Sequence, residues 1–163
     1  MEFSVRPLAE SDADELFDLV NEIKDEGRYL YYSLRFQRDS TSGYIESHNS
    51  SGNPILGAFG AGELLGFIDF NPGKFEEVEH VASIGMGVRE GFRGRGIGSA
   101  LMDACVGQAR KLGLEKLELE VFSSNAAAIG LYEKKGFERE GVMRRKRKFE
   151  GRYEDVICMG LFL

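Results

Sequence analysis

The sequence has few cysteines and no long apolar run, and each scarcity removes a class of protein. Its two cysteines, Cys105 and Cys158, both stand among apolar residues, so we expect two buried, reduced thiols rather than a disulfide. No stretch of roughly 18 apolar residues occurs, so no membrane span is expected. The first residues, MEFSVRPL, lack a basic segment followed by an apolar run, which argues against a signal peptide. We therefore expect a cytoplasmic protein with no membrane partner.

Positive charge is also in short supply. The 21 Lys and Arg residues face 27 Asp and Glu residues, which gives a net charge of −6. Proteins that bind nucleic acid as their main partner are usually basic, so no nucleic-acid partner is expected. The basic run at residues 144–148 would alternate between both faces of a strand, so we interpret it as part of a solvated hairpin. The acidic balance suits a cationic substrate such as an amine.

The chain does contain enough apolar residues to form a core. Hydrophobic residues make up 42% and charged residues 29% of 163 residues, a composition typical of a globular fold. A chain of this length suits one domain with its own core, and neither an internal repeat nor a linker is visible. We therefore treat residues 1–163 as a single domain.

Apolar periodicity predicts the element order β-α-α-β-β-β-α-β-α-β-β. The strand at 117–121 follows a helix rather than a hairpin, so it should run parallel to the strand before that helix. The expected fold is therefore an α/β mixed sheet, mostly antiparallel, with one central parallel pair. The predicted elements are a strand at 3–5, a helix capped by Ser11 and stopped by Gly27, a short helix capped by Asp39 or Ser40, strands at 55–59, 64–70 and 79–88, a helix at 97–112, a strand at 117–121, a helix at 126–135 capped by Ser124 or Asn125, and strands at 137–149 and 153–163.

Residues 28–53 have no clear period and leave two interpretations open. The segment begins with an aromatic cluster of Tyr29, Tyr31, Tyr32 and Phe36. It could form a variable lid over a substrate pocket. It could equally be two ordinary helical pieces that pack their aromatic side chains on the sheet.

The loop between the third predicted strand of the meander and the next helix is dense in glycine and arginine. Gly94, Gly96 and Gly98 have no Cβ, so the backbone there can turn sharply and approach a ligand closely. A strand, a glycine-rich loop and a helix together present unpaired N–H groups to an anion. Arg93 and Arg95 add positive charge to the loop. The pattern predicts a cradle for a pyrophosphate, with at least one arginine in contact with phosphate.

One alternative is a dinucleotide-binding oxidoreductase. Gly94, Gly96 and Ser99 approximate the G-x-G-x-x-G fingerprint, and Glu118 or Glu120 follows roughly 20 residues later. However, Ser99 replaces the third glycine, and only one helix and a hairpin follow the unit. A doubly wound fold needs more β-α-β units, so this alternative is disfavoured.

Two motifs in the right order carry a resemblance to a known family. Arg93-Gly-Arg-Gly-Ile-Gly98 fits Gln/Arg-x-x-Gly-x-Gly/Ala, and a second signature runs from Asn125 through Leu131-Tyr132 to Gly136-Phe137. Together they resemble the GNAT superfamily of N-acetyltransferases, and the predicted element order is similar to that fold over nearly the whole chain. The resemblance implies acetyl-CoA as co-substrate and no metal.

The resemblance also implies a role for particular residues. The pyrophosphate would lie on the N–H groups of Arg93, Gly94, Arg95, Gly96, Ile97, Gly98 and Ser99. The pantetheine arm would pair with the strand edge at Met86 and Val88, like an added strand. Asn125 matches the position that contacts the coenzyme arm, and Tyr132 matches the position that protonates the departing thiolate.

Acetyl transfer to an amine needs an acid, an oxyanion donor and a route for the amine proton. A phenol titrates near ~10, so the neutral Tyr132 hydroxyl can donate at pH 7. We expect the backbone N–H of Met86 or a neighbour to meet the oxyanion. His80 is the leading candidate base, since its even spacing puts it on the face of Met86, while Glu120 and Asp69 are alternatives. Water could also carry the proton.

The sequence does not decide which amine accepts the acetyl group. A small-molecule amine is favoured over a protein N-terminus because no peptide groove can be inferred, and a homodimer is left open. Cys105 lies on an apolar helix stripe, so direct transfer is expected rather than an acyl-enzyme intermediate. A second alternative is a non-catalytic acyl-CoA-binding module that regulates a partner, because its cradle would have the same sequence.

Overall fold

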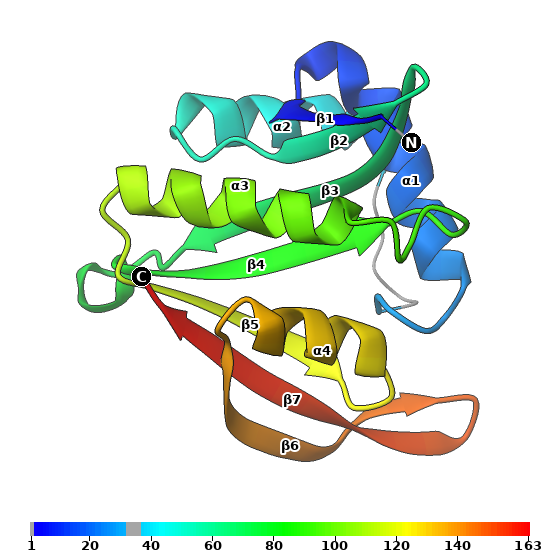
Figure 1. Cartoon of the computed structure of the whole chain (residues 1–163), viewed down its shortest axis with the longest axis vertical. Helices are drawn as coiled ribbons and strands as arrows, with labels where there is room; N and C mark the ends of the chain where they lie inside the picture. The colour runs from blue at the N-terminus through cyan, green and yellow to red at the C-terminus, as the bar shows by residue number, and fades with distance from the viewer. Residues whose placement is uncertain (1, 32–36) are drawn as a thin grey trace.

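The computed structural model describes residues 2–31 and 37–163. Its strands form one mixed sheet in the order β1-β2-β3-β4-β5-β7-β6 (Figure 1). The predicted order of helices and strands is confirmed. The strands are β1 Ser4–Pro7, β2 Leu56–Gly60, β3 Glu63–Pro72, β4 Val81–Val88, β5 Lys116–Phe122, β6 Glu138–Phe149 and β7 Arg152–Phe162, and the α-helices are α1 Ala13–Asp25, α2 Arg38–Ser50, α3 Ile97–Lys111 and α4 Ala126–Lys134.

The sheet contains one parallel pair, as predicted. The pairs β1–β2, β2–β3, β3–β4, β5–β7 and β6–β7 are all antiparallel. Strands β4 and β5 are parallel, because α3 carries the chain back across one face between them. The central parallel pair therefore joins two antiparallel halves of the sheet.

The parallel pair is short. Its register runs only from Val81 opposite Lys116 to Ser83 opposite Glu118, although β4 continues to Val88 and β5 to Phe122. Beyond Ser83 the two strands diverge, as Figure 1 shows to the right of the C-terminus. Meanwhile β3 stays paired with β4, and β7 with β5. We call this opening between β4 and β5 the fork.

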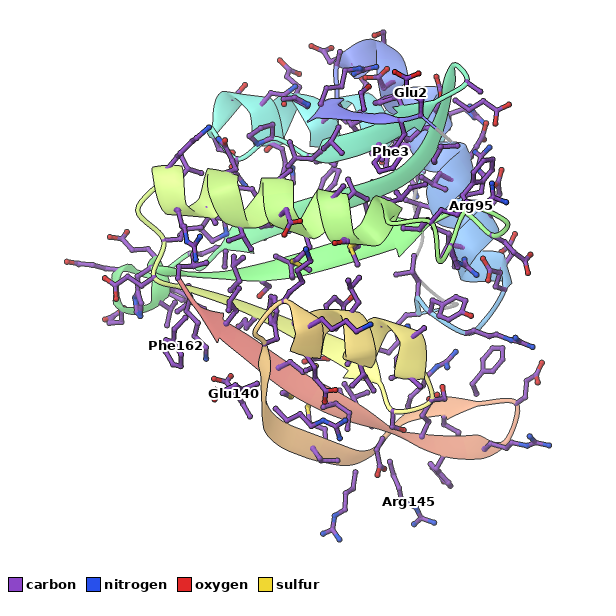
Figure 2. All side chains as sticks on the ribbon, in the orientation of Figure 1. Glu2, Phe3, Arg95, Glu140, Arg145 and Phe162 are labelled. Atoms are coloured by element: carbon purple, nitrogen blue, oxygen red, sulfur yellow. The ribbon has the colours of Figure 1, made fainter. Side chains whose placement is uncertain are left out.

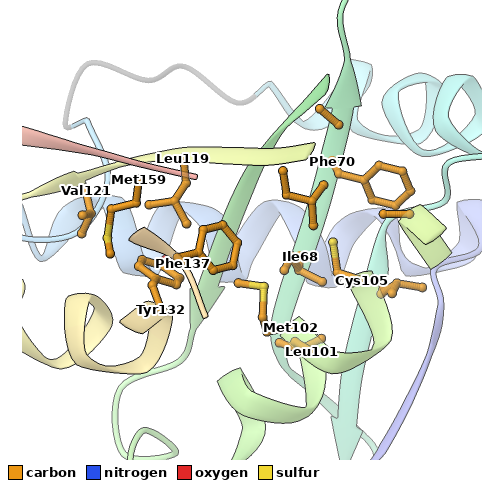
Figure 3. Packing of buried hydrophobic residues seen from close by; sticks show 14 of the residues in the cluster. Ile68, Phe70, Leu101, Met102, Cys105, Leu119, Val121, Tyr132, Phe137 and Met159 are labelled. Atoms are coloured by element: carbon orange, nitrogen blue, oxygen red, sulfur yellow. The ribbon is translucent and has the colours of Figure 1, made fainter. Parts of the chain in front are cut away.

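Two apolar clusters hold helices on the two faces of the sheet. The larger one lies under α3 and α4, which cover the face turned to the viewer in Figure 1. Figure 3 shows its packing, with Tyr132 beside Phe137 and Leu119 beside Met159. The second cluster lies under α1, whose buried residues are the predicted stripe of Leu16, Leu19, Val20 and Ile23. No helix in the described part of the chain combines the length and apolar character needed to cross a bilayer.

Some predicted boundaries are wrong. A 3-10 turn at Glu10–Asp12 precedes α1, so Ser11 does not cap it. Helix α2 begins at Arg38, which places Asp39 in its first turn rather than before it. A second 3-10 turn at Glu76–Val78 delays the start of β4, which was expected at residue 79. Of the two cap residues predicted for α4, Asn125 is confirmed. Tyr32 and Phe36 of the aromatic cluster lie outside the described residues.

The two cysteines differ in exposure. Cys105 is fully buried in the cluster under α3, as predicted. Cys158 on β7 is only partly buried, so its prediction as a buried thiol is wrong. The error comes from the strand period, because Cys158 alternates with the buried residues Ile157 and Met159 and faces the other way.

The start of the chain is tied down by a partly buried carboxylate. Asp12 accepts hydrogen bonds from Arg6 Nη1 at 2.7 Å, from Arg6 Nη2 at 3.0 Å and from the Ala9 N–H at 2.7 Å. The hydrogen bond from Arg6 holds the pKa of Asp12 below its ordinary value of 3.8, against the opposing effect of burial. Since the folded pKa is depressed, this stabilisation is present above pH 4 and is lost as the pH falls through the folded pKa.

We therefore expect Asp12→Asn to lower the free energy of unfolding by about 1 kcal/mol at pH 7. The difference in unfolding free energy between the variant and the parent protein should narrow as the pH falls below about 4, because the parent carboxylate takes up a proton as the pH passes through its depressed pKa. Urea unfolding at pH 7 and at pH 3 measures both gaps. An equal gap at the two pH values would contradict the charge-based account.

Candidate active site

A cleft of about 650 Å³ opens at the fork. This volume lies within the range of small-molecule sites in proteins. The walls come from β4 and the glycine-rich loop after it, from β5, from α4, and from the end of α1 with the residues that follow. Predicted site residues in these walls are Met86, Val88, Arg93, Gly94, Gly96, Gly98, Ser99, Glu120, Asn125 and Tyr132.

The glycine-rich loop leads into α3 with the backbone bent as an anion site requires. Gly96 is the N-cap of α3 and has φ +86°, and Gly94 has φ +73°. Residues other than glycine adopt such left-handed φ angles only at a cost in free energy, which explains why glycine occupies both positions. No side chain caps α3, so its first N–H groups have no side-chain partner and open on the cleft where Gly98 and Ser99 line it.

The edge of β4 presents backbone groups to the fork. The Arg89 N–H donates to the Leu65 carbonyl at 2.8 Å, so residue 89 faces β3. The Val88 carbonyl instead accepts from Arg93 Nε at 2.8 Å, so residue 88 faces away from β3. The backbone groups of an antiparallel strand alternate in direction from residue to residue. The N–H and carbonyl of Met86 therefore point into the fork, as those of Val88 do. The β4–β5 ladder ends at Ser83, so within the described sheet the Met86 N–H and carbonyl have no partner on β5.

The two loop arginines lie in different surroundings. The Arg93 guanidinium pairs with Glu26, with Nη1 and Nη2 at 2.7 and 2.5 Å from its two carboxylate oxygens. This hydrogen bond raises the pKa of Arg93. Arg95 is exposed and extends from the loop (Figure 2). Of the two cations predicted for phosphate, only Arg95 therefore lacks a carboxylate partner among the described residues. Ile97 is buried in the core, which leaves only its backbone for a ligand.

Helix α4 contributes two residues to the cleft, Tyr132 and its N-cap Asn125. Asn125 caps the helix, with its Oδ1 accepting from the Ala128 N–H at 3.2 Å. Tyr132 lines the cleft and packs its ring against Phe137, with ring centroids 5.8 Å apart. Its hydroxyl has no hydrogen-bond partner in residues 2–31 and 37–163. Burial raises the pKa of Tyr132 to about 12, so the phenol is protonated at neutral pH.

The structure does not bring His80 to the cleft. His80 is exposed and precedes the first residue of β4. It stands six residues before Met86, roughly 20 Å away along an extended chain. The spacing argument gave its face but not its distance.

Of the two carboxylate alternatives, Asp69 is already engaged. Its Oδ1 accepts from the Gly85 N–H at 3.0 Å and its Oδ2 accepts from the Tyr44 hydroxyl. Glu120 is exposed on β5 and is the one acidic residue among those described that lines the cleft. The nearby His48 Nε2 lies 3.0 Å from Asn71 Oδ1, which accepts a hydrogen bond from it, and completes a polar cluster under α2.

Residues 28–53, for which a lid over a substrate pocket was one of two open interpretations, contribute part of the cleft wall. Tyr29 and Leu30 line the cleft, and Tyr31 packs edge-on against Phe122 with ring centroids 5.2 Å apart. The aromatic composition of this segment hinted at a wall but not at its partner. Arg147 was predicted to be solvated, and that prediction is wrong, since it is 7% exposed. A register shift in β6 between Met143 and Arg147 turns it inward.

Comparison with known proteins identifies the arrangement. The model of the acetyltransferase (GNAT) family matches residues 13–137, which is more than half of the chain. The chain belongs to the GNAT family. It is accordingly an N-acetyltransferase that uses acetyl-CoA, and the two alternatives, a dinucleotide-binding oxidoreductase and a non-catalytic module, no longer apply.

Similar acetyltransferases cover all or part of the chain. An L-methionine sulfoximine/L-methionine sulfone acetyltransferase of Pseudomonas aeruginosa is 28% identical over 100% of this chain and 96% of that protein. An L-amino acid N-acetyltransferase of Escherichia coli is 33% identical over 60% of this chain and 61% of that protein. The crystal structure of a GNAT-family acetyltransferase from Streptococcus pneumoniae superposes with a TM-score of 0.93 at 25% identity, covering 99% and 100% of the two chains.

We expect Gly96→Val to raise the Kd for acetyl-CoA by at least about tenfold, because φ +86° strains a β-branched residue where the pyrophosphate should bind. Isothermal titration calorimetry measures the change. The matched control is Gly107→Ala in the middle of α3, where an added Cβ meets nothing within 4 Å. The control should bind acetyl-CoA like the parent. Equal affinity for a folded Gly96→Val variant would count against the placement of the pyrophosphate.

Proposed function

We propose that the protein transfers the acetyl group of acetyl-CoA directly to the primary amine of a small molecule, with amino acids and their derivatives as the first class to test. The supporting observation is the fork, which carries a protonated phenol, Tyr132, and a carboxylate, Glu120, in one cleft. The names of the two relatives described above favour amino-acid amines over larger acceptors.

The acid and the carboxylate come from opposite faces of the sheet. Leu119 and Val121 of β5 pack into the cluster under α4, on the side of Tyr132. Glu120 lies between them in sequence and therefore faces the other way. An acetyl group held in the fork would then have its leaving sulfur on the Tyr132 side and the attacking amine on the Glu120 side. This geometry lets the amine reach the carbonyl carbon from one side of the fork while the acid reaches the departing sulfur from the other.

The transfer can be written with these residues. The amine nitrogen attacks the acetyl carbonyl carbon, and negative charge on the oxygen is met by the Met86 N–H. The carbon–sulfur bond breaks, and the Tyr132 hydroxyl gives its proton to the thiolate. The amine proton leaves to Glu120, directly or through water. We assign no base role to His80, because it lies outside the cleft.

No covalent intermediate on cysteine is needed. Cys105 is fully buried, and burial raises the pKa of its thiol to about 12, with a smaller contribution from the charge of Asp69. A protonated, buried thiol is a poor nucleophile. The proposal is therefore direct transfer in a ternary complex.

The deciding experiment is an acceptor screen that reads the release of the coenzyme A thiol. The panel should contain the common L-amino acids, L-methionine sulfone, polyamines and a short peptide with a free N-terminus. Release with at least one amino acid or derivative supports the proposal. Release with the peptide alone would redirect it to a protein N-terminus, and no release with any amine would reject it.

We expect Tyr132→Phe to lower kcat by about 100-fold, the contribution typical of a general acid. The acetyl-CoA Kd should stay unchanged, because the ring contact with Phe137 is kept and the hydroxyl binds no described protein group. Steady-state kinetics and calorimetry measure the two quantities. An unchanged kcat, where chemistry limits the rate, would remove Tyr132 from the acid role.

We expect Glu120→Gln to lower kcat/KM for the amine at least about tenfold, because the amide cannot take a proton. His80→Gln is the matched comparison and should stay within about twofold of the parent, as an exposed residue away from the cleft does. The same thiol-release assay measures both. The reverse order of effects would restore His80 as the base.

A further inference from the structure

The residues after α1 are held from both sides of the fork. We call residues 26–31 the strap. Arg93, from the loop after β4, pairs with Glu26 at the beginning of the strap. Arg147, from β6 in the other half of the sheet, donates to the carbonyl of Gly27, the next residue. Figure 1 shows the end of α1 beside the open end of the fork. Two arginines from opposite sides thus converge on two consecutive residues.

The Arg93 guanidinium uses all its nitrogens within the protein. Nη1 and Nη2 form the two bonds to Glu26, and Nε donates to the Val88 carbonyl at 2.8 Å. Its face lies over the Tyr29 ring, with the guanidinium carbon 4.4 Å from the ring centroid. One side chain therefore joins the strap to the β4 edge of the fork. A phosphate ligand would have to compete with all of these contacts.

Arg147 is anchored from the other side of the fork. It is 7% exposed, and its guanidinium carbon lies 4.1 Å from the Phe122 ring centroid and 4.7 Å from that of Phe149. Its Nη1 donates to Glu154 at 2.9 Å, while Nη2 donates to the Gly27 carbonyl. Gly27 has φ +66°, and a Cβ there would lie 2.7 Å from Phe149, so the strap packs closely at this point.

The rest of the strap forms the cleft wall on the side of Glu120. Tyr29 and Leu30 line the cleft. Tyr31 packs on Phe122 of β5, and its pKa is raised by burial and by the charge of Glu120, two residues before Phe122. The strap therefore reaches the side of the fork from which the amine should enter.

We propose that Arg93 and Glu26 are positioning residues for the amine acceptor: their ion pair, with Arg147 opposite, fastens the strap across the fork and sets the acceptor wall. The acceptor part of this inference rests on the proposed function. It separates the two loop arginines by role. Arg93 acts on the amine acceptor through the strap, and Arg95 is the loop arginine that remains available to bind the phosphates of acetyl-CoA.

The test compares Glu26→Gln, Arg93→Gln and Arg95→Gln in one set of measurements. The probes are acetyl-CoA alone, by calorimetry, and acetyl transfer to L-methionine sulfone, or to the best amine of the screen. Glu26→Gln and Arg93→Gln should each raise the amine KM about fivefold or more and leave the acetyl-CoA Kd unchanged. Arg95→Gln should raise the acetyl-CoA Kd and leave the amine KM unchanged. Asp14→Asn, an exposed carboxylate of α1 that pairs with Arg38, should change neither.

A double variant tests the pair itself. If Glu26 and Arg93 act through each other, Glu26→Gln/Arg93→Gln should raise the amine KM no more than either single variant does. Additive effects would mean that the two residues act separately and would overturn the pairing. A rise in the acetyl-CoA Kd for Arg93→Gln, with no change in amine KM, would overturn it in favour of a phosphate ligand.

Amide hydrogen exchange of residues 26–31 gives a readout that needs no acceptor. Glu26→Gln should speed exchange across the strap, and Arg95→Gln should not, while protection in α3 stays the same in both. If the parent protein acetylates no amine but the strap exchanges faster in Glu26→Gln, the proposed function fails and the fastening stands. Unchanged exchange in Glu26→Gln would overturn the fastening itself.

Discussion

The whole site depends on a backbone constraint: β4 and β5 stop pairing after Ser83 and Glu118. Past that point each strand keeps its outer neighbour and exposes its inner edge. Exposed strand edges are open to pairing with another extended chain, and the pantetheine arm of coenzyme A, with its two amides, is such a chain. The glycine-rich loop then lies at the wide end of the fork, where it meets the start of α3. Under the proposed function, one interruption in the sheet would therefore organise both binding and chemistry.

The surroundings on the two sides of the fork also differ. On the α3 and α4 side, Tyr132 is surrounded by apolar residues, and this burial keeps its proton in place. On the other side, Glu120 is exposed and the strap places Tyr31 close to it. Alternation along β5 puts Leu119 and Glu120 on opposite faces, so a single strand serves an apolar core and a polar entrance at once.

What the sequence could predict was local. The stripe of α1, the glycines of the loop and Asn125 as a cap follow from spacing and backbone preference within a few residues. The Arg93–Glu26 pair joins residues 67 positions apart, and no periodicity reports such a contact. Arg147 was missed because the register shift in β6, with Arg145 at φ +54°, reverses the alternation on which the solvated interpretation rested. For His80 the period assumed a strand that already included residue 80, whereas β4 begins at Val81 and leaves His80 in the preceding turn.

The shortness of the β4–β5 ladder has a mechanical consequence. Three residue pairs are the only strand register across the middle of the described sheet, with a strap bridging the far end. An arm of coenzyme A lying along β4 would add a rung of main-chain bonds where the protein has left a gap. The bound co-substrate would then link the two antiparallel halves of the sheet and reduce their relative motion. The site would become rigid when the acetyl group to be transferred is bound.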